Sequence, residues 1–212
     1  MSRPKPAVPD AFVRAVGRRV AHVTAASNVP SIRDAGLKPA AQLAVEASCD
    51  PDTLTLRAKR MAVGPALLNH QRPILHGITA ARAMLDGHDP ASWAAQLDTR
   101  VFLWPGARGQ RFAASIARDV PIAILWLDAR LLARTMADLI DLCPLNSGNF
   151  VQGGARAARG DWIYTPLTAG LHTFRTARQR RGLVKTPDTV REISLRAALP
   201  ATLIQDVEVI HA

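Results

Sequence analysis

The sequence predicts a single α+β domain, and three observations support this. The chain of 212 residues is 48% hydrophobic, which is enough for one substantial core. Short β-prone runs alternate with segments of helical apolar spacing along the chain, as expected for mixed structure. No shift in composition marks a second domain. We therefore expect one domain over residues 10–212, preceded by a disordered leader at residues 1–9, which carries two basic residues among three prolines.

The stretch Arg19–Leu37 predicts a strand, a polar corner and a short helix. Val20–Val23 is β-prone, and either Ser27 or Asn28 offers a capping oxygen to the amides that follow,. Pro30 suits the first helical turn, where its missing N–H costs nothing,. The glycine before the final leucine of the stretch supplies the left-handed residue that commonly ends such a helix,.

His22 and Thr24 stand at the end of this strand, immediately before the helix. Ligands are often held where strands end and helices begin. Two interpretations of His22 remain open: a ligand contact, or a buried histidine that hydrogen-bonds a neighbouring carbonyl group.

Three helices are predicted in the next part of the chain. Pro39–Ala47 forms the first, and Thr53–Asn69 has apolar residues at helical spacing, with an interruption at Gly64-Pro65,. Pro90–Leu97 forms the third, with Asp89 as its N-terminal cap,.

Two strands, each followed by a helix, are predicted next. Arg100–Trp104 forms a strand that a proline stops, and Ala107–Arg118 forms a basic amphipathic helix,. Val120–Leu127 is almost continuously apolar, which is typical of a central strand,. Asp128–Leu142 completes this part as a further helix.

The last third of the chain begins with a predicted long loop, residues 144–166, which is rich in glycine and asparagine,. The basic residues 175–185 suggest a mobile arm. Val190–Leu195 alternates as a strand, Pro200–Ile204 turns, and Val207–Ile210 forms the last strand,.

Composition excludes several classes of protein. No apolar run reaches the roughly 18 residues of a membrane-spanning helix, and the N-terminus lacks the apolar segment of a signal peptide,. We therefore expect a cytoplasmic protein without a membrane partner. The two cysteines, Cys49 and Cys143, have no zinc or disulfide spacing, and the six histidines form no metal motif,. No metal cofactor is expected.

The formal net charge is +10. Residues 156–196 concentrate it, since nine basic residues stand there against three acidic ones, giving +6. Such an excess favours phosphate-bearing partners, either nucleic acid or a dinucleotide. The alternative is compositional, because 23 of the 27 basic residues are arginine and an arginine-rich proteome produces the same excess without function.

Glu192 is the acidic residue best placed for chemistry. It lies in the predicted strand Val190–Leu195, where apolar Ile193 and Leu195 mark the buried face, so its own side chain should point to the opposite face. A carboxylate there can accept hydrogen bonds from ligand hydroxyls or orient a nucleophile. The alternative is a solvated glutamate paired with a nearby arginine.

The order of three segments resembles the DarT-type ADP-ribosyltransferases, and more closely a group of uncharacterised bacterial proteins that look like their relatives. Together the segments span most of the chain. They are His22-Val-Thr24 with Asn28, Ile32 and Gly36-Leu37, then Arg100-Val-Phe-Leu-Trp-Pro105, and then Glu192-Ile-Ser-Leu195 with Pro200 and a closing strand.

The resemblance implies a fold of the ADP-ribosyltransferase type, with a split mixed or antiparallel sheet surrounded by helices. It implies that NAD is a substrate, that His22, Thr24 and Asn28 bind it, and that Glu192 is catalytic. No arginine of this chain matches the family's arginine unambiguously. Arg72 is the first choice for a phosphate or ribose contact, and the others are Arg57, Arg60 and Arg82.

The predicted function is accordingly that of an NAD-dependent ADP-ribosyltransferase, an enzyme of the glycosyltransferase class, with nucleic acid as a candidate acceptor bound through the basic region 156–196. Two alternatives remain. One is an NAD glycohydrolase, in which water is the acceptor. The other is a non-catalytic module that binds a nucleotide or nucleic acid.

Overall fold

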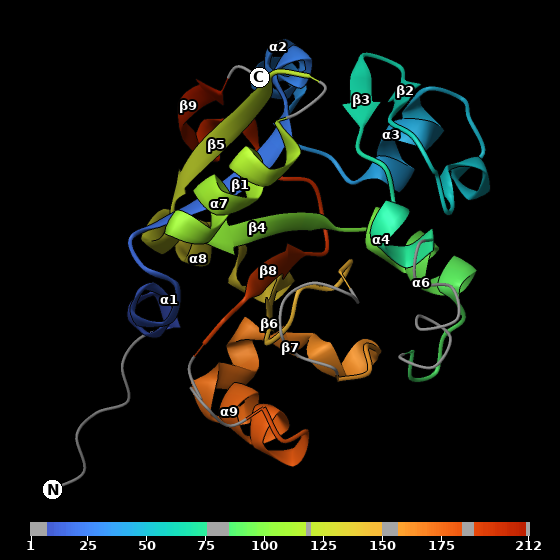
Figure 1. Ribbon diagram of the computed structural model, residues 1–212. Coiled ribbons are helices and arrows are strands. Elements are labelled where there is room, and N and C mark those ends of the chain that lie inside the picture. Colours follow the sequence, from blue (N-terminus) through green and yellow to red (C-terminus); the bar gives the residue numbers. More distant parts are fainter. Residues whose placement is uncertain (1–7, 76–84, 118–119, 150–156, 184–188, 211–212) are drawn as a thin grey trace, which may run out of the picture.

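A computed structural model describes residues 8–75, 85–117, 120–149, 157–183 and 189–210. The chain forms a single α+β domain built on a seven-stranded sheet of the described residues, with strand order β7-β6-β8-β4-β1-β5-β9 (Figure 1). Neighbouring strands of this described sheet pair antiparallel. The strands are β1 Arg19–Ala25, β4 Val101–Pro105, β5 Ile122–Asp128, β6 Ile140–Cys143, β7 Thr165–Pro166, β8 Glu192–Leu195 and β9 Ile204–Ile210.

Helices surround the sheet (Figure 1). None of those described is long and apolar enough to cross a membrane. The largest apolar cluster joins α1, α8 and α9 to the sheet, and a second cluster lies under α7. The helices are α1 Val8–Val16, α2 Val29–Ala35, α3 Ala40–Glu46, α4 Arg72–Leu75, α6 Pro90–Asp98, α7 Ala107–Ile116, α8 Ala129–Met136 and α9 Gly170–Arg180.

The sheet opens between β1 and β4. These strands pair only at Val20 with Pro105 and at Ala21 with Trp104, whereas β1 pairs with β5 over its whole length. Beyond Ala21, therefore, β1 has no backbone pairing partner among the described residues on its β4 side, and Figure 1 shows the two strands diverging. His22 and the rest of β1 border the opening that results.

A separate hairpin, β2 Met61–Val63 and β3 Ala66–Leu68, lies beside α3 (Figure 1). It packs on α3 through its own small apolar cluster. The predicted helix over Thr53–Asn69 is therefore wrong. Gly64-Pro65 makes the hairpin turn instead of breaking a helix, since Gly64 has φ +53°, a conformation that favours glycine.

The predicted helix Asp128–Leu142 ends too late, because α8 stops at Met136 and β6 follows at Ile140–Cys143. Each residue of β6 is buried. β6 has only four residues, Ile-Asp-Leu-Cys, and buries its charged residue Asp141, so its sequence shows no clear break from that of the helix,.

The two segments expected to be unfolded are in part helical. Residues 1–7 lie outside the described residues, but Val8 and Pro9 belong to α1, which buries Phe12 and Val16. The expected mobile arm 175–185 is helix α9 as far as Arg180, because buried Phe174 anchors that helix to the core. Residues 184 and 185 are not among those described.

Most of the other predicted elements are confirmed. The five predicted strands correspond to β1, β4, β5, β8 and β9, and four predicted helices correspond to α2, α3, α6 and α7. Asp89 caps α6 as expected, accepting a hydrogen bond from the backbone of Ser92. Within the long loop 144–166, a short 3₁₀ helix forms at Asp161–Ile163 and is followed by β7, while residues 150–156 lie outside the description.

Candidate functional site

A cavity of about 600 Å³ lies at the opening between β1 and β4. Its walls come from these strands, the start of β8, α2, α3, α7, the hairpin and the loop after β6. Four of the five residues predicted for the site line it, namely His22, Thr24, Asn28 and Glu192. Residues far apart in the sequence are thus brought to one cavity.

His22 bridges the opening of the sheet. Its Nδ1 lies 2.8 Å from the carbonyl oxygen of Phe102 on β4. A carbonyl only accepts, so Nδ1 carries the proton and Nε2 of the neutral ring remains an acceptor. Burial lowers the pKa of His22 to about 4, against the smaller opposing effect of this hydrogen bond. The expected carbonyl contact and a place in the cavity wall are both observed.

Thr24 and Asn28 form a polar pair at the corner after β1. Asn28 donates from Nδ2 to Thr24 Oγ1 at 2.8 Å and to the carbonyl of Leu67 at 2.9 Å. Its Oδ1 accepts from the backbone N–H of Leu67 at 2.7 Å. Both the nitrogen and the oxygen of the Asn28 amide are therefore hydrogen-bonded, and these bonds hold β3 of the hairpin beside the cavity.

Glu192 opens β8 and is only 2% exposed. Its Oε1 accepts from the hydroxyl of Ser147 at 2.6 Å and from the backbone N–H of Ser147 at 3.1 Å. Burial raises the pKa of Glu192 to about 7, and the Ser147 bonds and the charge of Arg159 only partly oppose this. The alternative of a solvated glutamate paired with an adjacent arginine is wrong.

The loop that carries Ser147 is held from several sides. Trp93 Nε1 donates to the Ser147 carbonyl at 3.0 Å. Buried Arg159 donates to the carbonyls of Asn149 at 2.7 Å and Asn146 at 3.4 Å. Asn146 Oδ1 also accepts from the N–H of Gly148 at 3.0 Å. Because the backbone is fixed in this way, the Ser147 hydroxyl is pre-oriented toward Glu192.

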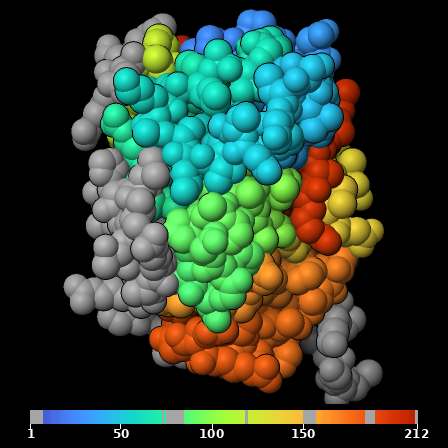
Figure 2. Space-filling model, turned by 90° about the vertical axis from the view of Figure 1, so that its right-hand side faces the viewer, coloured from blue at the N-terminus to red at the C-terminus, as the bar shows by residue number. Residues whose placement is uncertain are grey.

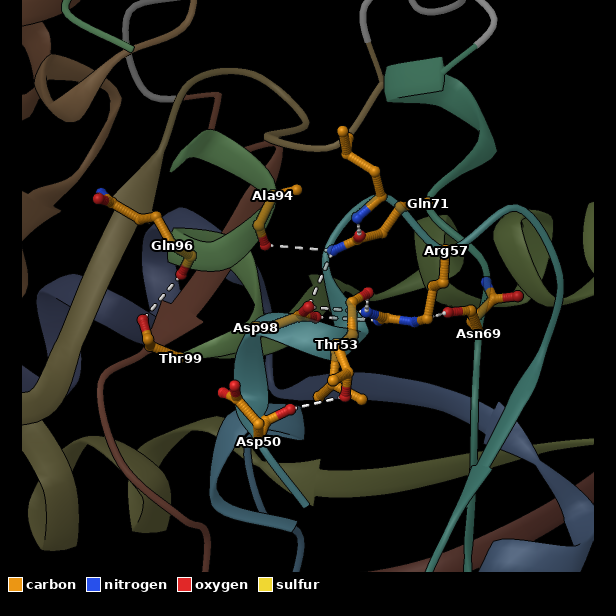
Figure 3. Close-up of polar contacts among 11 residues, drawn as sticks. Asp50, Thr53, Arg57, Asn69, Gln71, Ala94, Gln96, Asp98 and Thr99 are labelled. Atoms are coloured by element: carbon orange, nitrogen blue, oxygen red, sulfur yellow. Dashed lines mark hydrogen bonds and ion pairs between the residues drawn. The ribbon is translucent and has the colours of Figure 1, made fainter. Parts of the chain in front are cut away.

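A second buried carboxylate, Asp98, lines the same cavity but is enclosed by partners (Figure 3). Arg57 binds it with two hydrogen bonds of 2.7 and 2.9 Å, the geometry of a strong bidentate pair. Gln71 donates to it at 3.1 Å and also to the Ala94 carbonyl at 3.1 Å. This network joins the segment before the hairpin to α6.

Figure 2 shows the outer surface of the segments that this network joins. The segment with α3 and the hairpin, in blue to teal, covers the upper part of this face, and the green residues that include α6 lie directly below it. The Arg57–Asp98 pair therefore ties together two surface layers that close one side of the molecule.

The arginines proposed for a phosphate or ribose contact differ in position. Arg57 lines the cavity, but its guanidinium is occupied by Asp98 and by the Asn69 and Leu54 carbonyls. Arg60 also lines the cavity and donates to the Ile116 carbonyl at 3.2 Å. Arg72 is not among the lining residues, and its Nε donates to the Ala58 carbonyl. Arg82 lies outside the described residues.

Much of the charge of the basic region 156–196 is engaged within the chain. Positions 156 and 185 are not described. Four of the other seven basic residues serve contacts within the chain: Arg159 and Arg178 are buried, Arg181 pairs with Asp86, and Arg196 pairs with Asp141.

Aromatic and cationic groups complete the cavity wall. Phe102, Trp104 and Phe112 line it, and the rings of the last two stack with centroids 4.4 Å apart. Arg100 donates to Asp141 at 2.7 Å, and its guanidinium lies 3.9 Å from the centre of the Tyr164 ring. The cavity thus offers an apolar surface together with a few fixed polar groups, which is typical of small-molecule sites.

Three residues of this site escaped prediction from the sequence. Ser147 and Arg159 lie in the glycine-rich loop, whose composition gives no signal for a partner 45 residues away at Glu192. Asp98 is the last residue of α6 and is buried. A charged residue at a helix end is ordinarily expected to be exposed, and the sequence does not reveal that Arg57 pairs with it.

No group of three or more histidine, cysteine or acidic side chains in the described part of the chain is placed to hold a metal ion. The chemistry available in the cavity is that of hydrogen-bond acceptors and of one buried carboxylate, Glu192, that has no ion pair among the described residues. Such a set can orient hydroxyl groups and stabilise positive charge that develops nearby.

One protein family matches this chain. The model of a family of unknown function, DUF7002, matches residues 18–204, so the chain belongs to that family. The matched range contains every residue of the site described above. None of the curated proteins matches the chain.

Proposed function

We propose that this member of the DUF7002 family is an NAD-dependent ADP-ribosyltransferase. The observation that carries the proposal is that a single cavity is lined by His22 and Thr24 on β1 and by Glu192 at the start of β8. These are three of the residues that the resemblance to DarT-type enzymes assigns to NAD. They come from opposite sides of the sheet opening.

The two sides supply complementary groups. The ring of His22 is neutral near pH 7, because burial lowers its pKa to about 4, and its Nε2 can accept a hydrogen bond. On the other side, Oε2 of Glu192 receives no hydrogen bond from any described residue, since both Ser147 bonds reach Oε1. Acceptors on two sides suit a ribose, whose hydroxyl groups are donors.

The reaction that fits these groups is cleavage of the bond between C1′ of the nicotinamide ribose and the pyridinium nitrogen. The bonding electrons pass to that nitrogen, which neutralises nicotinamide and leaves an oxocarbenium-like centre. An ionised Glu192 near this centre stabilises its positive charge. The acceptor then forms a bond to C1′ and loses a proton. Because the acidic group must be ionised, the rate should rise with pH toward the Glu192 pKa of about 7,.

The acceptor we propose is nucleic acid, consistent with the net charge of +10,. A cytoplasmic location suits such a partner. If water takes the place of the acceptor, the same groups make the protein an NAD glycohydrolase.

The test is release of nicotinamide from NAD, with and without single-stranded DNA or RNA. We expect Glu192→Gln to reduce release by about 10²–10³-fold, the usual loss when one charge-stabilising group is removed. Glu208→Gln is the matched control, since Glu208 is exposed on β9 and the chemical change is identical.

The fold of each variant is checked by circular dichroism and thermal melting. Release that requires nucleic acid supports a transferase, and release without any acceptor supports the glycohydrolase. Release at the wild-type rate by a folded Glu192→Gln variant contradicts the proposal. Absence of release and of NAD binding in the wild-type protein also contradicts it.

A further inference from the structure

Three arginines meet where β4 ends and β8 begins. α7 starts directly after β4 and carries Arg108 and Arg111. β8 runs antiparallel to β4, with Leu103 opposite Ile193, so the start of β8 lies beside the end of β4. Arg191, the residue before β8, is therefore brought to the beginning of α7.

These three charges have no counter-charge among the described residues. No acidic side chain in the described part of the chain pairs with Arg108, Arg111 or Arg191, and the first turn of α7 holds no acidic residue. The N-terminus of a helix carries a partial positive charge and favours acidic residues. Arginines there are therefore repelled by this partial charge and by one another. Partial burial lowers the pKa of Arg108, and repulsion from Arg191 and then Arg111 lowers it further.

The arrangement differs from that of many other arginines in this protein. Arginines at six positions each face an aspartate within 4 Å, although the chain is rich in arginine overall. They are Arg19 with Asp206, Arg57 with Asp98, Arg100 and Arg196 with Asp141, Arg130 with Asp10, and Arg181 with Asp86. Arg108, Arg111 and Arg191 are distinguished by lying close enough to repel one another while none has an acidic partner among the described residues.

The group stands at the margin of the cavity. Arg108 shares a helix face with Phe112 and Ile116, which line the cavity,. Arg191 directly precedes Glu192. None of the three arginines lines the cavity itself, and Arg111 and Arg191 are exposed. A phosphate bound here would lie outside the cavity and close to the Glu192 end of it.

We propose that Arg108, Arg111 and Arg191 form a binding site for phosphate groups beside the cavity. Guanidinium groups bind phosphate oxygens through paired hydrogen bonds. The phosphates belong either to a polynucleotide backbone that passes the cavity or to the diphosphate of a dinucleotide. Because the site is open to solvent, the backbone of a polynucleotide fits it better. Its role in holding an acceptor rests on the proposed function, but its affinity for phosphate does not.

The test compares two double variants that each remove two positive charges. Arg108→Gln with Arg111→Gln changes the proposed site, and Arg191→Gln is added as a single variant. Arg14→Gln with Arg134→Gln is the control, because these exposed arginines of α1 and α8 lie outside the group. Binding of fluorescein-labelled single-stranded DNA is followed by anisotropy at several salt concentrations, without NAD, and NAD binding is followed by calorimetry.

We expect the site variants to weaken DNA binding about tenfold, and the double variant to reduce the log–log salt slope by about 1.4, or about 0.7 for each lost phosphate contact. The control should retain most of the affinity. If the site variants bind NAD more weakly but bind DNA as the wild type does, the phosphates that the site holds belong to the dinucleotide. Two results overturn the site: no loss for either ligand, or an equal loss in the control. DNA binding that depends on these arginines in a protein without nicotinamide release would refute the proposed function alone.

Discussion

Asp98 and Glu192 are both buried carboxylates in the wall of one cavity, yet their surroundings are opposite. Asp98 is held by the two-bond pair with Arg57 and by Gln71. Glu192 has no ion pair among the described residues and is bonded only by Ser147. One carboxylate has its full set of partners within the fold, and the other retains an oxygen with none.

The difference indicates a structural role for Asp98 and a role in ligand contact for Glu192. A buried charge is costly unless it is paired. The Asp98–Arg57 pair is therefore best explained as a structural link, here called a strut, between α6 and the segment before the hairpin. Burial raises the pKa of both carboxyl groups, but the contacts of Asp98 with Arg57 and Gln71 oppose the rise, whereas Glu192 has no ion pair among the described residues and its pKa reaches about 7. A carboxylate with a raised pKa and an oxygen that receives no hydrogen bond from the described residues is a candidate for contact with a ligand,. Four predictions follow from this contrast.

Asp98→Ala should have the largest effect on stability. It leaves the guanidinium of Arg57 buried without a counter-charge, which typically costs about 3–5 kcal/mol. Urea denaturation measures the loss. Asp206→Ala is the control, because it breaks an exposed ion pair with Arg19, and such pairs contribute at most about 1 kcal/mol. Equal losses in the two variants would show that Asp98 is not a strut.

Glu192→Gln should change the pH dependence of stability. The pKa of the Glu192 carboxyl is about 7 in the fold and 4.5 ordinarily. Between these values the folded state keeps a proton that the unfolded state has lost, so the wild type loses stability as the pH rises, by about 3 kcal/mol. Glutamine does not titrate.

The variant should therefore be as stable as the wild type near pH 4.5 and more stable above pH 7. Denaturation midpoints of both proteins across this range provide the measurement. Parallel curves would mean that Glu192 is not desolvated.

His22→Gln should act in the opposite direction. The pKa of His22 falls from 6.5 to about 4 on burial. In this window the unfolded state binds a proton that the folded state does not, so the wild type loses stability as the pH falls, by at most about 3 kcal/mol. The loss is smaller if the ring is partly hydrated through the cavity.

Because glutamine does not titrate, the His22→Gln variant should not show this loss of stability as the pH falls. Denaturation midpoints measured over the same pH range provide the test. Because the His22 and Glu192 effects have opposite signs, each must be read from its own variant and not from the wild type alone. If His22→Gln lost as much stability at acid pH as the wild type does, the ring of His22 would be solvated.

Ser147→Ala should have the smallest effect. It removes the 2.6 Å hydrogen bond that favours ionised Glu192, so the pKa of Glu192 should rise further, by about one unit. The pH midpoint of nicotinamide release should move upward by the same amount. Ser115→Ala is the control, since that exposed hydroxyl bonds the Phe112 carbonyl. A lower rate with an unmoved midpoint would exclude this positioning role.

Much of the fold was predictable because local signals agreed with tertiary structure. The continuous apolar run of β5 and the capping aspartate of α6 are strong local patterns. β6 and the hairpin were missed because their strands are short. β6 has four residues, including the charged Asp141, and closely follows a helix, and each hairpin strand has only three residues, too few to show a period.

The site was predictable only where a residue type carries its own signal. His22, Thr24 and Glu192 stand out in short strands, and the cavity brings them together. The arginine could not be chosen, because the partner that occupies Arg57 is 41 residues away. Arg72 stood out beside a proline, yet its side chain bonds the Ala58 carbonyl and does not reach the cavity wall.

The most direct test is a crystal structure of the protein with a hydrolysis-resistant NAD analogue. We expect the nicotinamide ribose to lie in the opening between β1 and β4, with its hydroxyl groups within hydrogen-bond distance of Glu192 Oε2 and His22 Nε2. The Arg57–Asp98 pair should be unchanged. An analogue that binds elsewhere, or that displaces Arg57 from Asp98 while leaving Glu192 untouched, would contradict this expectation.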